Sequence, residues 1–443
     1  MLIHLWLIRL LLLLAVTVNI SIMKKLLFLA HSANIGGAEL ALKGLIDSIQ
    51  GDYTITVVLP TKKKPNPIII NSRVSYISIP LPWWCHEAHD SPTKINKKQL
   101  TTNYEKLKSI AKNHDILLTN TITIPWLGFV ATELSKPHIW YIHEFGNIDH
   151  NLKFILGYKR SLQVISKTSS RILTISNAVK NHISQAIPTS QIDIIHQSIE
   201  LDKLIVIKPC PVDIKNIKLL CMGAMKPSKG QDIAVGAVKQ LRDKGITVSL
   251  DIIGPSANSS FVEKLNKFSS DYDNVTIKSQ SFNVIDELSS HNALLMCSSN
   301  EALGRVTIES MASGLPVIGF ASPSTKYLLG NNRGLLYTEN NAKSLANAIE
   351  KFINKPNLIN TKSAQVFVKN NFSNDVQAKD FNKCVENALS TNAFHNNCLN
   401  EYLDKISEDG LLYNTSGSIK NKVKVSAIKY TPKTIKKIVK KLL

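Results

Sequence analysis

Short apolar runs alternate with longer stretches of helical periodicity over most of the chain. In the first half, runs such as 24–32 and 114–121 are rich in Leu and Ile and have the length of buried strands. The strand-like runs lie at 24–32, 53–60, 74–81, 114–121, 137–144 and 170–176, and the helical stretches lie at 34–49, 98–113, 126–134 and from 177 onward. Strands that alternate with helices form a mostly parallel sheet covered on both faces. The pattern therefore predicts one α/β domain, which ends near residue 204.

The same alternation restarts after a connector that contains prolines. The strand-like runs of this second half lie at 217–224, 248–255, 274–280, 293–299, 316–320 and 333–338, and the helical stretches lie at 232–245, 261–270, 284–291, 305–314 and 342–354. We expect two Rossmann-like domains, at 23–205 and 217–372, joined by a linker at 206–216. Ligands of such sheets bind beyond the carboxyl ends of the strands, so the expected site is a cleft across which the two sheets face each other.

Composition limits the class of protein and of partner. The 443 residues are 44% hydrophobic and 19% charged, which indicates globular domains rather than a disordered chain. The formal net charge of +20 favours a polyanionic partner such as nucleic acid, anionic lipid or a phosphorylated substrate. Lys, Asn and Ile are frequent throughout, so a compositional bias explains the charge equally well. The six cysteines form no CxxC pair and have no zinc-like spacing, which fits incidental thiols in a reducing compartment.

The first 22 residues form a separate apolar run that contains Arg9. Three interpretations remain open: residues translated from a start codon upstream of the true one at Met23, a membrane anchor, or a secretory signal. The run has no basic region before it and no clear cleavage site, which weighs against a signal.

A basic tail occupies residues 393–443. From residue 410 onward it has nine lysines and no acid. Thr431 and Pro432 suit the start of a helix whose apolar and lysine faces are opposite, which predicts a helix lying on an anionic membrane surface. A solvated tail and a nucleic-acid arm are the alternatives, although no aromatic residues are interleaved as stacking platforms.

Two glycines, Gly36 and Gly37, stand at the turn from the first strand into the first helix. Glycine lets a ligand approach the backbone closely, and a helix N-terminus favours anions, so this turn suits a diphosphate. A plain tight turn is the alternative. A second candidate is Lys229, in the loop after the first strand of the second half, where an ammonium could neutralise a leaving phosphate or simply be solvated.

Two carboxylates, Glu301 and Glu309, stand eight positions apart around the turn at Gly304. Glu301 follows an apolar strand, and Glu309 lies about one turn into the next helix, which the amides of Gly304, Arg305 and Val306 open. Carboxylates accept paired hydrogen bonds from diols, so one acid suits a ribose and the other the hydroxyls of a sugar. The alternative is a pair of surface acids at a helix end.

His143 ends the apolar run at 137–144 and faces the same cleft if the fold is as expected. It could bind the transferred sugar or the acceptor. The alternative is a structural histidine.

These motifs together resemble family 4 of the glycosyltransferases, which have the GT-B fold, use nucleotide-sugar donors and retain anomeric configuration. The resemblance covers about residues 23–389. It is carried by GGAE at 36–39, HE at 143–144, TISNAV at 174–179, GAMKPSKGQD at 223–232, the two glutamates with ESMASGLPVI at 309–318, and GNNRGLLY at 330–337. The resemblance implies that the first domain is the acceptor side, that the second binds the donor, and that a helix at 373–392 returns toward the first domain.

The resemblance also implies roles for the candidate residues. Glu309 is expected to bind the donor ribose, and Glu301 the hydroxyls of the transferred sugar, beside the amides that follow Gly304. Gly37, with Gly36 in the same turn, and Lys229 are expected at the diphosphate, and His143 near the reacting carbon. The leaving phosphate, rather than an enzymic nucleophile, is expected to deprotonate the acceptor. No metal and no other cofactor is expected.

The expected function follows from the resemblance and the basic tail. It is transfer of a sugar, with retention, to a glycan or lipid-linked acceptor at the cytoplasmic surface of the inner membrane, in the synthesis of lipopolysaccharide, capsule or exopolysaccharide. A departure from the family keeps a second hypothesis open: Ala224 stands where an Arg is usual, which removes one diphosphate contact unless Lys226 or Arg305 replaces it. A non-catalytic scaffold or nucleotide-sugar-binding partner is therefore the alternative. Nucleic acid is not expected as a partner.

Overall fold

The computed structural model describes residues 23–391 together with 399 and 402, apart from gaps at 35, 62–70, 88–96, 208, 210–215, 271–272 and 279–282. The predictions for residues 1–22 and for the tail at 403–443 lie outside the described residues. Among the helices that are described, none is long and apolar enough to cross a membrane.

The N-terminal domain is built on a seven-stranded sheet in the order β3-β2-β1-β5-β6-β8-β9, and every pairing in it is parallel. Its strands are β1 (Lys24–Leu29), β2 (Tyr53–Leu59), β3 (Ser75–Ser78), β5 (Ile116–Asn120), β6 (His138–Ile142), β8 (Arg171–Thr174) and β9 (Ile192–Ile194). Its helices are α2 (Gly37–Ile49), α3 (Lys97–Ala111), α4 (Trp126–Leu134), α5 (Tyr158–Lys167) and α6 (Asn177–Ile183), and Thr189–Gln191 forms a short 3-10 turn. β5 and β6 are buried along their whole length, which explains why they are continuous apolar runs and not alternating ones.

The C-terminal domain has a six-stranded parallel sheet in the order β12-β11-β10-β13-β14-β15. Its strands are β10 (Ile217–Met222), β11 (Val248–Ile253), β12 (Val275–Lys278), β13 (Ala293–Met296), β14 (Val317–Phe320) and β15 (Leu335–Tyr337). Its helices are α8 (Gln231–Asp243), α9 (Ser259–Ser269), α10 (Val284–Ser290), α11 (Arg305–Ser313), α12 (Pro323–Leu329), α13 (Ala342–Asn354) and α14 (Thr361–Asn371), with 3-10 turns at Pro227–Lys229 and Pro356–Leu358. In both sheets the chain order reverses beside the first strand, the point at which Rossmann-like sheets bind ligands.

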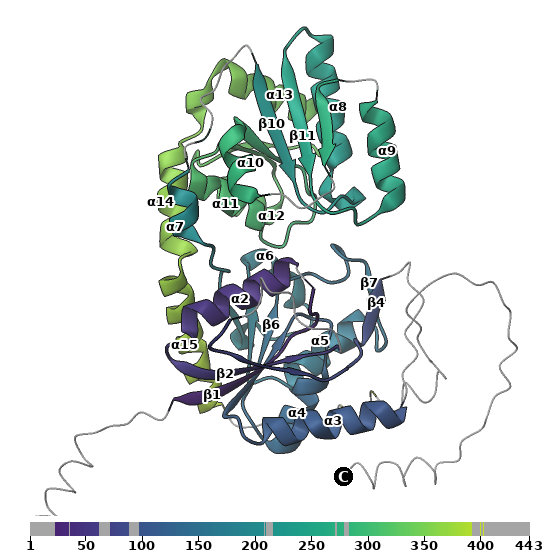
Figure 1. The fold of residues 1–443 in the computed structure, drawn as a ribbon, viewed down its shortest axis with the longest axis vertical. Helices are drawn as coiled ribbons and strands as arrows, with labels where there is room; N and C mark the ends of the chain where they lie inside the picture. The colour runs from purple at the N-terminus through teal and green to yellow at the C-terminus, as the bar shows by residue number, and fades with distance from the viewer. Residues whose placement is uncertain are drawn as a thin grey trace, which may run out of the picture.

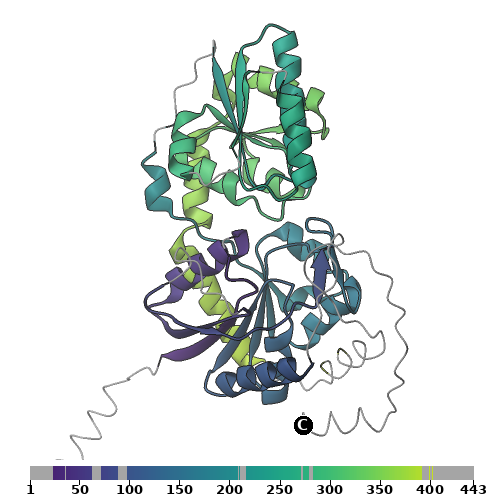
Figure 2. The same cartoon turned by 45° about the vertical axis from the view of Figure 1, so that its right-hand side comes forward.

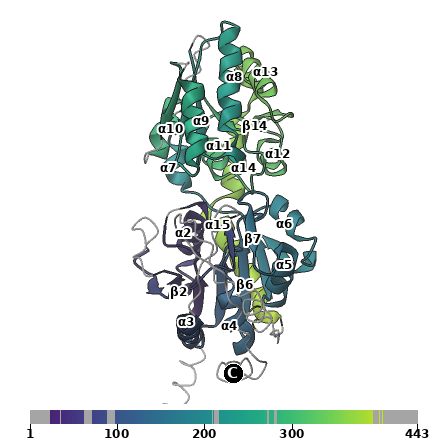
Figure 3. The same ribbon diagram turned by 90° about the vertical axis from the view of Figure 1, so that its right-hand side faces the viewer.

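The two domains lie one above the other along the longest axis of the molecule (Figures 1 and 3). The predicted α/β fold of two Rossmann-like domains is confirmed. The sequence pattern did not predict β4 (Cys85–Glu87) and β7 (Leu152–Phe154), which form a small antiparallel pair outside the main sheets. It also did not predict α5 or α12.

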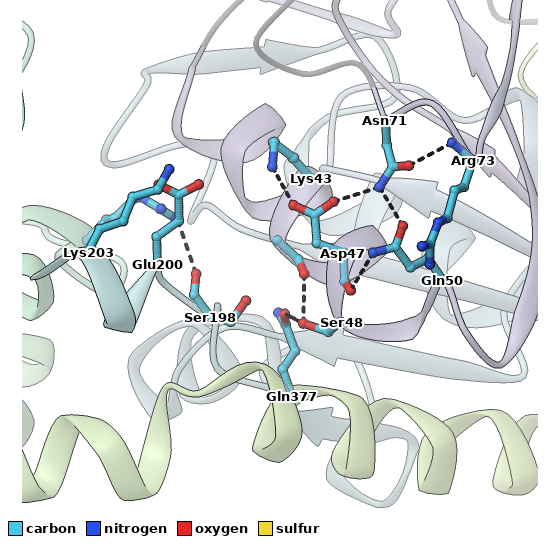
Figure 4. Close-up of polar contacts among 12 residues, drawn as sticks. Lys43, Asp47, Ser48, Gln50, Asn71, Arg73, Ser198, Glu200, Lys203 and Gln377 are labelled. Atoms are coloured by element: carbon cyan, nitrogen blue, oxygen red, sulfur yellow. Dashed lines mark hydrogen bonds and ion pairs between the residues drawn. The ribbon is translucent and has the colours of Figure 1, made fainter.

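The chain crosses between the domains twice. It enters the C-terminal domain after the short helix α7 (Leu201–Ile205), and the last described helix, α15 (Asn374–Ser390), runs back along the N-terminal domain (Figure 2). There Gln377 of α15 accepts a hydrogen bond from Ser48 of α2 at 3.1 Å, and Figure 4 shows this pair beside Ser198 of the first crossing. Helix α15 therefore contacts α2, and so does the loop that leads into the C-terminal domain, through Ser198 beside Gly44.

Candidate functional site

The glycine turn before α2 has one crowded and one open position. A side-chain carbon at Gly36 would lie 2.8 Å from Oε2 of Glu39, whereas one at Gly37 would meet nothing within 4 Å. Gly36 is also the N-cap of α2 and offers the helix no side chain. A side chain at position 36 would thus have to displace the Glu39 carboxylate, whereas the space in front of Gly37 is open.

Glu39 and His31 form a buried pair behind this turn. Oε1 of Glu39 lies 3.0 Å from Nδ1 of His31, but neither atom has a hydrogen bond of good geometry among the described residues. Burial raises the pKa of Glu39 to about 7. Burial, and next the neighbouring His150, lower the pKa of His31 to about 4. The sequence analysis included Glu39 only as the last residue of GGAE at 36–39 and did not pair it with His31, because the two residues belong to different elements.

His143 directly follows β6 and has a partner at each ring nitrogen. Its Nε2 donates to Oδ1 of Asn120 at 2.7 Å, and its Nδ1 accepts from Nε2 of Gln197 at 3.1 Å. Burial, and then His31, lower its pKa to about 3, so the ring is neutral at ordinary pH. In this arrangement His143 can act on a substrate only by exchanging one of these two hydrogen bonds.

The next residue, Glu144, binds backbone amides of two loops. Its carboxylate accepts from the amide of Ile122 at 2.9 Å and from the amide of His143 at 3.0 Å. Burial raises its pKa to about 8, although these two amides favour the ionised form. Glu144 therefore joins the loops that follow β5 and β6 and fixes the backbone position of His143.

Lys229 and Glu301 meet between the loops that follow β10 and β13. Nζ of Lys229 lies 2.8 Å from Oε2 of Glu301, and both side chains are largely buried. Burial by itself raises the pKa of Glu301, but the ammonium of Lys229 outweighs it, and the pKa is lowered overall. Lys229 is held in place by Gly230, whose positive φ of 67° brings its backbone so close to Cys297 that a side-chain carbon would lie 2.5 Å from the carbonyl oxygen.

Glu309 lies in the second turn of α11, as predicted, and pairs with Arg305 one turn earlier. Nε of Arg305 lies 2.8 Å from Oε1 of Glu309. The helix begins after Gly304, which has a φ of 96° that only glycine adopts without strain. Burial raises the pKa of Glu309, and Arg305 opposes this shift. The two predicted carboxylates are thus both present, and each is held by its own cation.

Lys226 lies in the same loop as Lys229 and interacts with it electrostatically. Its Nζ donates to the carbonyl oxygen of Asp149 in the N-terminal domain at 3.2 Å. Burial, and next the charge of Lys229, lower its pKa. Lys226 therefore lies near Lys229 and spans the two domains, whereas Ala224 provides no charge.

The loop at 196–200 connects the two sets of residues. Gln197 binds His143, and the carbonyl oxygen of the adjacent Ser198 accepts from Nη1 of Arg305 at 3.4 Å. Ser176 also crosses the domains through a hydrogen bond from its hydroxyl to the carbonyl oxygen of Ala302. The structure thus links His143 to the helix that carries Glu309. The sequence analysis gave no signal for this link.

One group of side chains among the described residues has the composition of a metal site, and it contains none of the predicted site residues. Asp251, Glu287 and His291 place ligand atoms within 4.8 Å of one another. Nζ of Lys278 already lies 2.8 Å from Oδ2 of Asp251. A hydrogen bond from His291, and next one from Lys278, lower the pKa of Asp251 to about 2. The ammonium thus already neutralises this cluster.

A family model, a sequence relative and solved structures all compare this chain with glycosyltransferases. Residues 208–374 match the model of the family described as glycosyl transferases group 1. An uncharacterized glycosyltransferase of Haemophilus influenzae is 25% identical over 268 residues, which are 59% of this chain and 74% of that protein.

Solved structures agree with the fold. Anabaena Alr3699/HepE in complex with UDP and glucose superposes with a TM-score of 0.66 at 18% identity, covering 82% of this chain and 99% of that one. The apo form of the lipopolysaccharide outer core galactosyltransferase WaaB superposes with a TM-score of 0.63 at 17% identity, covering 82% and 99%. The fold is therefore GT-B, and the sequence matches support the glycosyltransferase superfamily.

Proposed function

We propose that this protein transfers a sugar from a nucleotide-diphosphate donor to a hydroxyl of a glycan or lipid-linked acceptor, with retention of configuration. The observation that carries the proposal is the pairing of Lys229 with Glu301 and of Arg305 with Glu309 at the carboxyl ends of the C-terminal strands. Two carboxylates and two cations there match the diols and the diphosphate of such a donor. UDP is bound in the HepE structure that this chain resembles in fold.

Donor binding is proposed to exchange partners within these pairs. A diphosphate beside Gly37 and Lys229 draws the ammonium away from Glu301, whose carboxylate then accepts hydroxyls of the transferred sugar. Glu309 accepts the ribose hydroxyls, and Lys226 adds the charge that Ala224 lacks. Because the cations neutralise the phosphates directly, we expect transfer to continue in the presence of EDTA.

In the transfer step, the bond from the anomeric carbon to the phosphate oxygen breaks and the nucleoside diphosphate leaves. A phosphate oxygen takes the proton of the acceptor hydroxyl, and the acceptor oxygen bonds to the anomeric carbon on the same face. The protein stabilises the developing phosphate charge through Lys226 and Lys229. We place neutral His143 beside the sugar, where a ring nitrogen exchanges Gln197 or Asn120 for a hydroxyl.

The test is a thermal-shift and hydrolysis panel of UDP-, GDP- and ADP-sugars on the full chain, with Glu309→Gln as the variant. A matched control is Glu350→Gln, which alters a glutamate on α13 that pairs at the surface with Lys244. We expect one donor to stabilise the protein and be slowly hydrolysed, and Glu309→Gln alone to abolish both effects. Failure of every donor to bind would overturn the proposal.

The alternative of a nucleotide-sugar-binding scaffold rests on Ala224. It predicts a donor that binds through Glu309 but is neither hydrolysed nor transferred. Binding with turnover would exclude it. The proposed place of action is the cytoplasmic surface of the inner membrane, where the basic tail would hold the enzyme. The proposed process is the synthesis of a surface polysaccharide such as lipopolysaccharide, capsule or exopolysaccharide.

A further inference from the structure

Trp83 presents an exposed indole in the N-terminal domain. It is 38% exposed, whereas Trp84, Trp126 and Trp140 are all nearly fully buried. Its Nε1 donates to the carbonyl oxygen of His31 at 2.9 Å, and its ring centroid lies 5.5 Å from that of the His31 imidazole. The indole is therefore held in one orientation by the strand-end residue His31 while a face remains open to solvent.

The group behind Trp83 lacks a satisfactory partner within the protein. Glu39 is only 4% exposed, and its Oε1, with Nδ1 of His31, has no well-formed hydrogen bond among the described residues. A buried carboxyl without full hydrogen bonding is costly, and such groups are frequent at binding sites. Because Nδ1 of His31 is directed to Glu39, Nε2 is the ring nitrogen that remains for a ligand.

His31 follows β1 and Trp83 follows β3, so both lie beyond the carboxyl ends of parallel strands, at the same edge of the sheet where His143 follows β6. His31 contributes to the lowered pKa of His143, after burial. His150 contributes to the lowered pKa of His31, and Lys226 and Lys229 in turn contribute to that of His150. Trp83 and His31 therefore share this edge with the loop after β6, in which Asp149 accepts a hydrogen bond from Lys226 of the second domain, three residues before Lys229.

We propose that Trp83 and His31 form a subsite for a pyranose of the acceptor. The indole stacks on the apolar face of the ring, and Nε2 of His31, oriented by Glu39, hydrogen-bonds a hydroxyl. An aromatic face next to polar groups is the pattern that suits a sugar, which has an apolar face and a hydroxylated edge. This inference rests on the proposed function and narrows it: the acceptor is a sugar-terminated glycan and not a bare lipid phosphate.

The first experiment needs no donor. Acrylamide quenches the fluorescence of exposed indoles. The part of this quenching that is present in the full chain and lost in Trp83→Phe therefore reports on Trp83. We expect methyl pyranosides of glucose, galactose, mannose or N-acetylglucosamine to protect this component, and a short-chain isoprenyl phosphate not to do so. Protection by the isoprenyl phosphate alone, or by no probe, would overturn the subsite even if a donor binds.

The second experiment uses the donor identified by the panel above and the glycoside that protects best. We expect Trp83→Ala to raise the KM for the glycoside about tenfold, the upper range for one aromatic contact, with no matching loss of donor hydrolysis. Trp83→Phe should recover most of the affinity. Phe268→Ala is the matched control, because Phe268 is an exposed aromatic residue of α9 in the other domain. An unchanged KM in Trp83→Ala would refute the inference.

Glu39 is a positioning residue in this proposal, and its role has a separate readout. Glu39→Gln keeps the size of the side chain but removes its titration, so the KM for the glycoside should lose the pH dependence that it has near pH 7 in the wild type. A merely structural role would lower the stability of the protein and leave the shape of that pH profile unchanged. If no donor binds at all, the quenching experiment still decides on the subsite, so the two proposals can fail separately.

Discussion

At the residue scale, Lys229 and Glu301 form an ion pair within the predicted site. Each side chain has lost much of its contact with water and depends on the other for a partner. Removing one partner of such a pair leaves the other charge uncompensated, which costs more than the pair contributes. The same carboxylate and ammonium are the groups that a donor would engage, so the pair keeps both ionised and in place.

We therefore expect Lys229→Met to destabilise the protein by about 2 kcal/mol, a value reduced from that of a fully buried pair because Lys229 is partly exposed. The pKa of Glu301 should rise, because burial then acts without its opposing charge. Urea denaturation at pH 7 measures the effect. The double variant Lys229→Met with Glu301→Gln should recover much of the loss; additive losses would show that the pair is not coupled.

Glu39 gives a second prediction at this scale, which concerns pH. Its pKa is raised by burial to about 7 in the folded protein, so between pH 4.5 and 7 the folded state binds more protons than the unfolded state. Its contribution to stability is complete below the unfolded pKa and is lost as pH rises through about 7. Glu39→Gln should therefore gain stability relative to wild type on going from pH 5 to pH 8, by roughly 1–3 kcal/mol. Urea denaturation at both pH values tests this, and an equal difference at the two would contradict it.

At the scale of elements, glycines at the ends of helices hold the site residues. Gly304 begins α11 and Gly314 ends it, both with positive φ, so Glu309 lies in a helix whose limits are fixed by backbone geometry. The turn before α2 combines a crowded glycine with an open one. A substitution at Gly36 therefore meets the carboxylate of Glu39, whereas one at Gly37 meets no neighbouring atom.

Gly36→Ala and Gly37→Ala are consequently a matched pair. The first should destabilise the protein by about 1 kcal/mol or more, because the new carbon meets the Glu39 carboxylate at 2.8 Å. The second should leave stability unchanged or raise it by up to ~1 kcal/mol, because alanine favours the helix and meets no neighbour. If a diphosphate lies against Gly37, the second variant should still weaken donor binding severalfold. Thermal melts and donor titrations separate the two effects, and unchanged donor affinity in Gly37→Ala would remove that residue from the site.

At the scale of the whole molecule, a few polar contacts connect the two domains across the predicted site. Nε2 of His196 meets the hydroxyl of Tyr327 at 3.0 Å, and Lys226 reaches the carbonyl oxygen of Asp149. Lys226 belongs to the loop that carries Lys229, and Asp149 belongs to the loop that follows β6 and carries His143, whereas Tyr327 lies in α12. The residues proposed to bind the donor and the acceptor therefore lie on opposite domains, which these contacts join.

The basic tail belongs to this scale as well, and its role stays a prediction. Deleting residues 410–443 removes nine lysines and no acid. We expect the shortened chain to lose binding to vesicles that contain about 30% phosphatidylserine and to retain donor hydrolysis, since each lysine near such a surface contributes roughly 1 kcal/mol. Vesicle co-sedimentation at low and high salt measures the effect. Undiminished sedimentation of the shortened chain would show that the tail is not the membrane contact.

Much of the fold was predictable from local pattern. The apolar runs of β5, β6 and β13 and the apolar face of α2 recur at periods that the backbone imposes, so the sequence alone indicates strand or helix there. The pair β4 and β7 was not predictable, because three-residue strands carry no period and depend on a partner distant in sequence. The positions of Glu301 and Glu309 were predictable for the same local reason, since both lie within one strand–turn–helix unit.

The sequence by itself determined the two α/β domains, the glycines at their turns and the spacing of the two glutamates, because backbone periodicity and φ preference act over a few residues. Only the tertiary structure decided which side chains pair with one another, such as Lys229 with Glu301 and Gln197 with His143. It also decided that Trp83 is exposed while Trp84 beside it is buried. These contacts join residues that are far apart along the chain, and their partners are set by packing and desolvation, which no local pattern records.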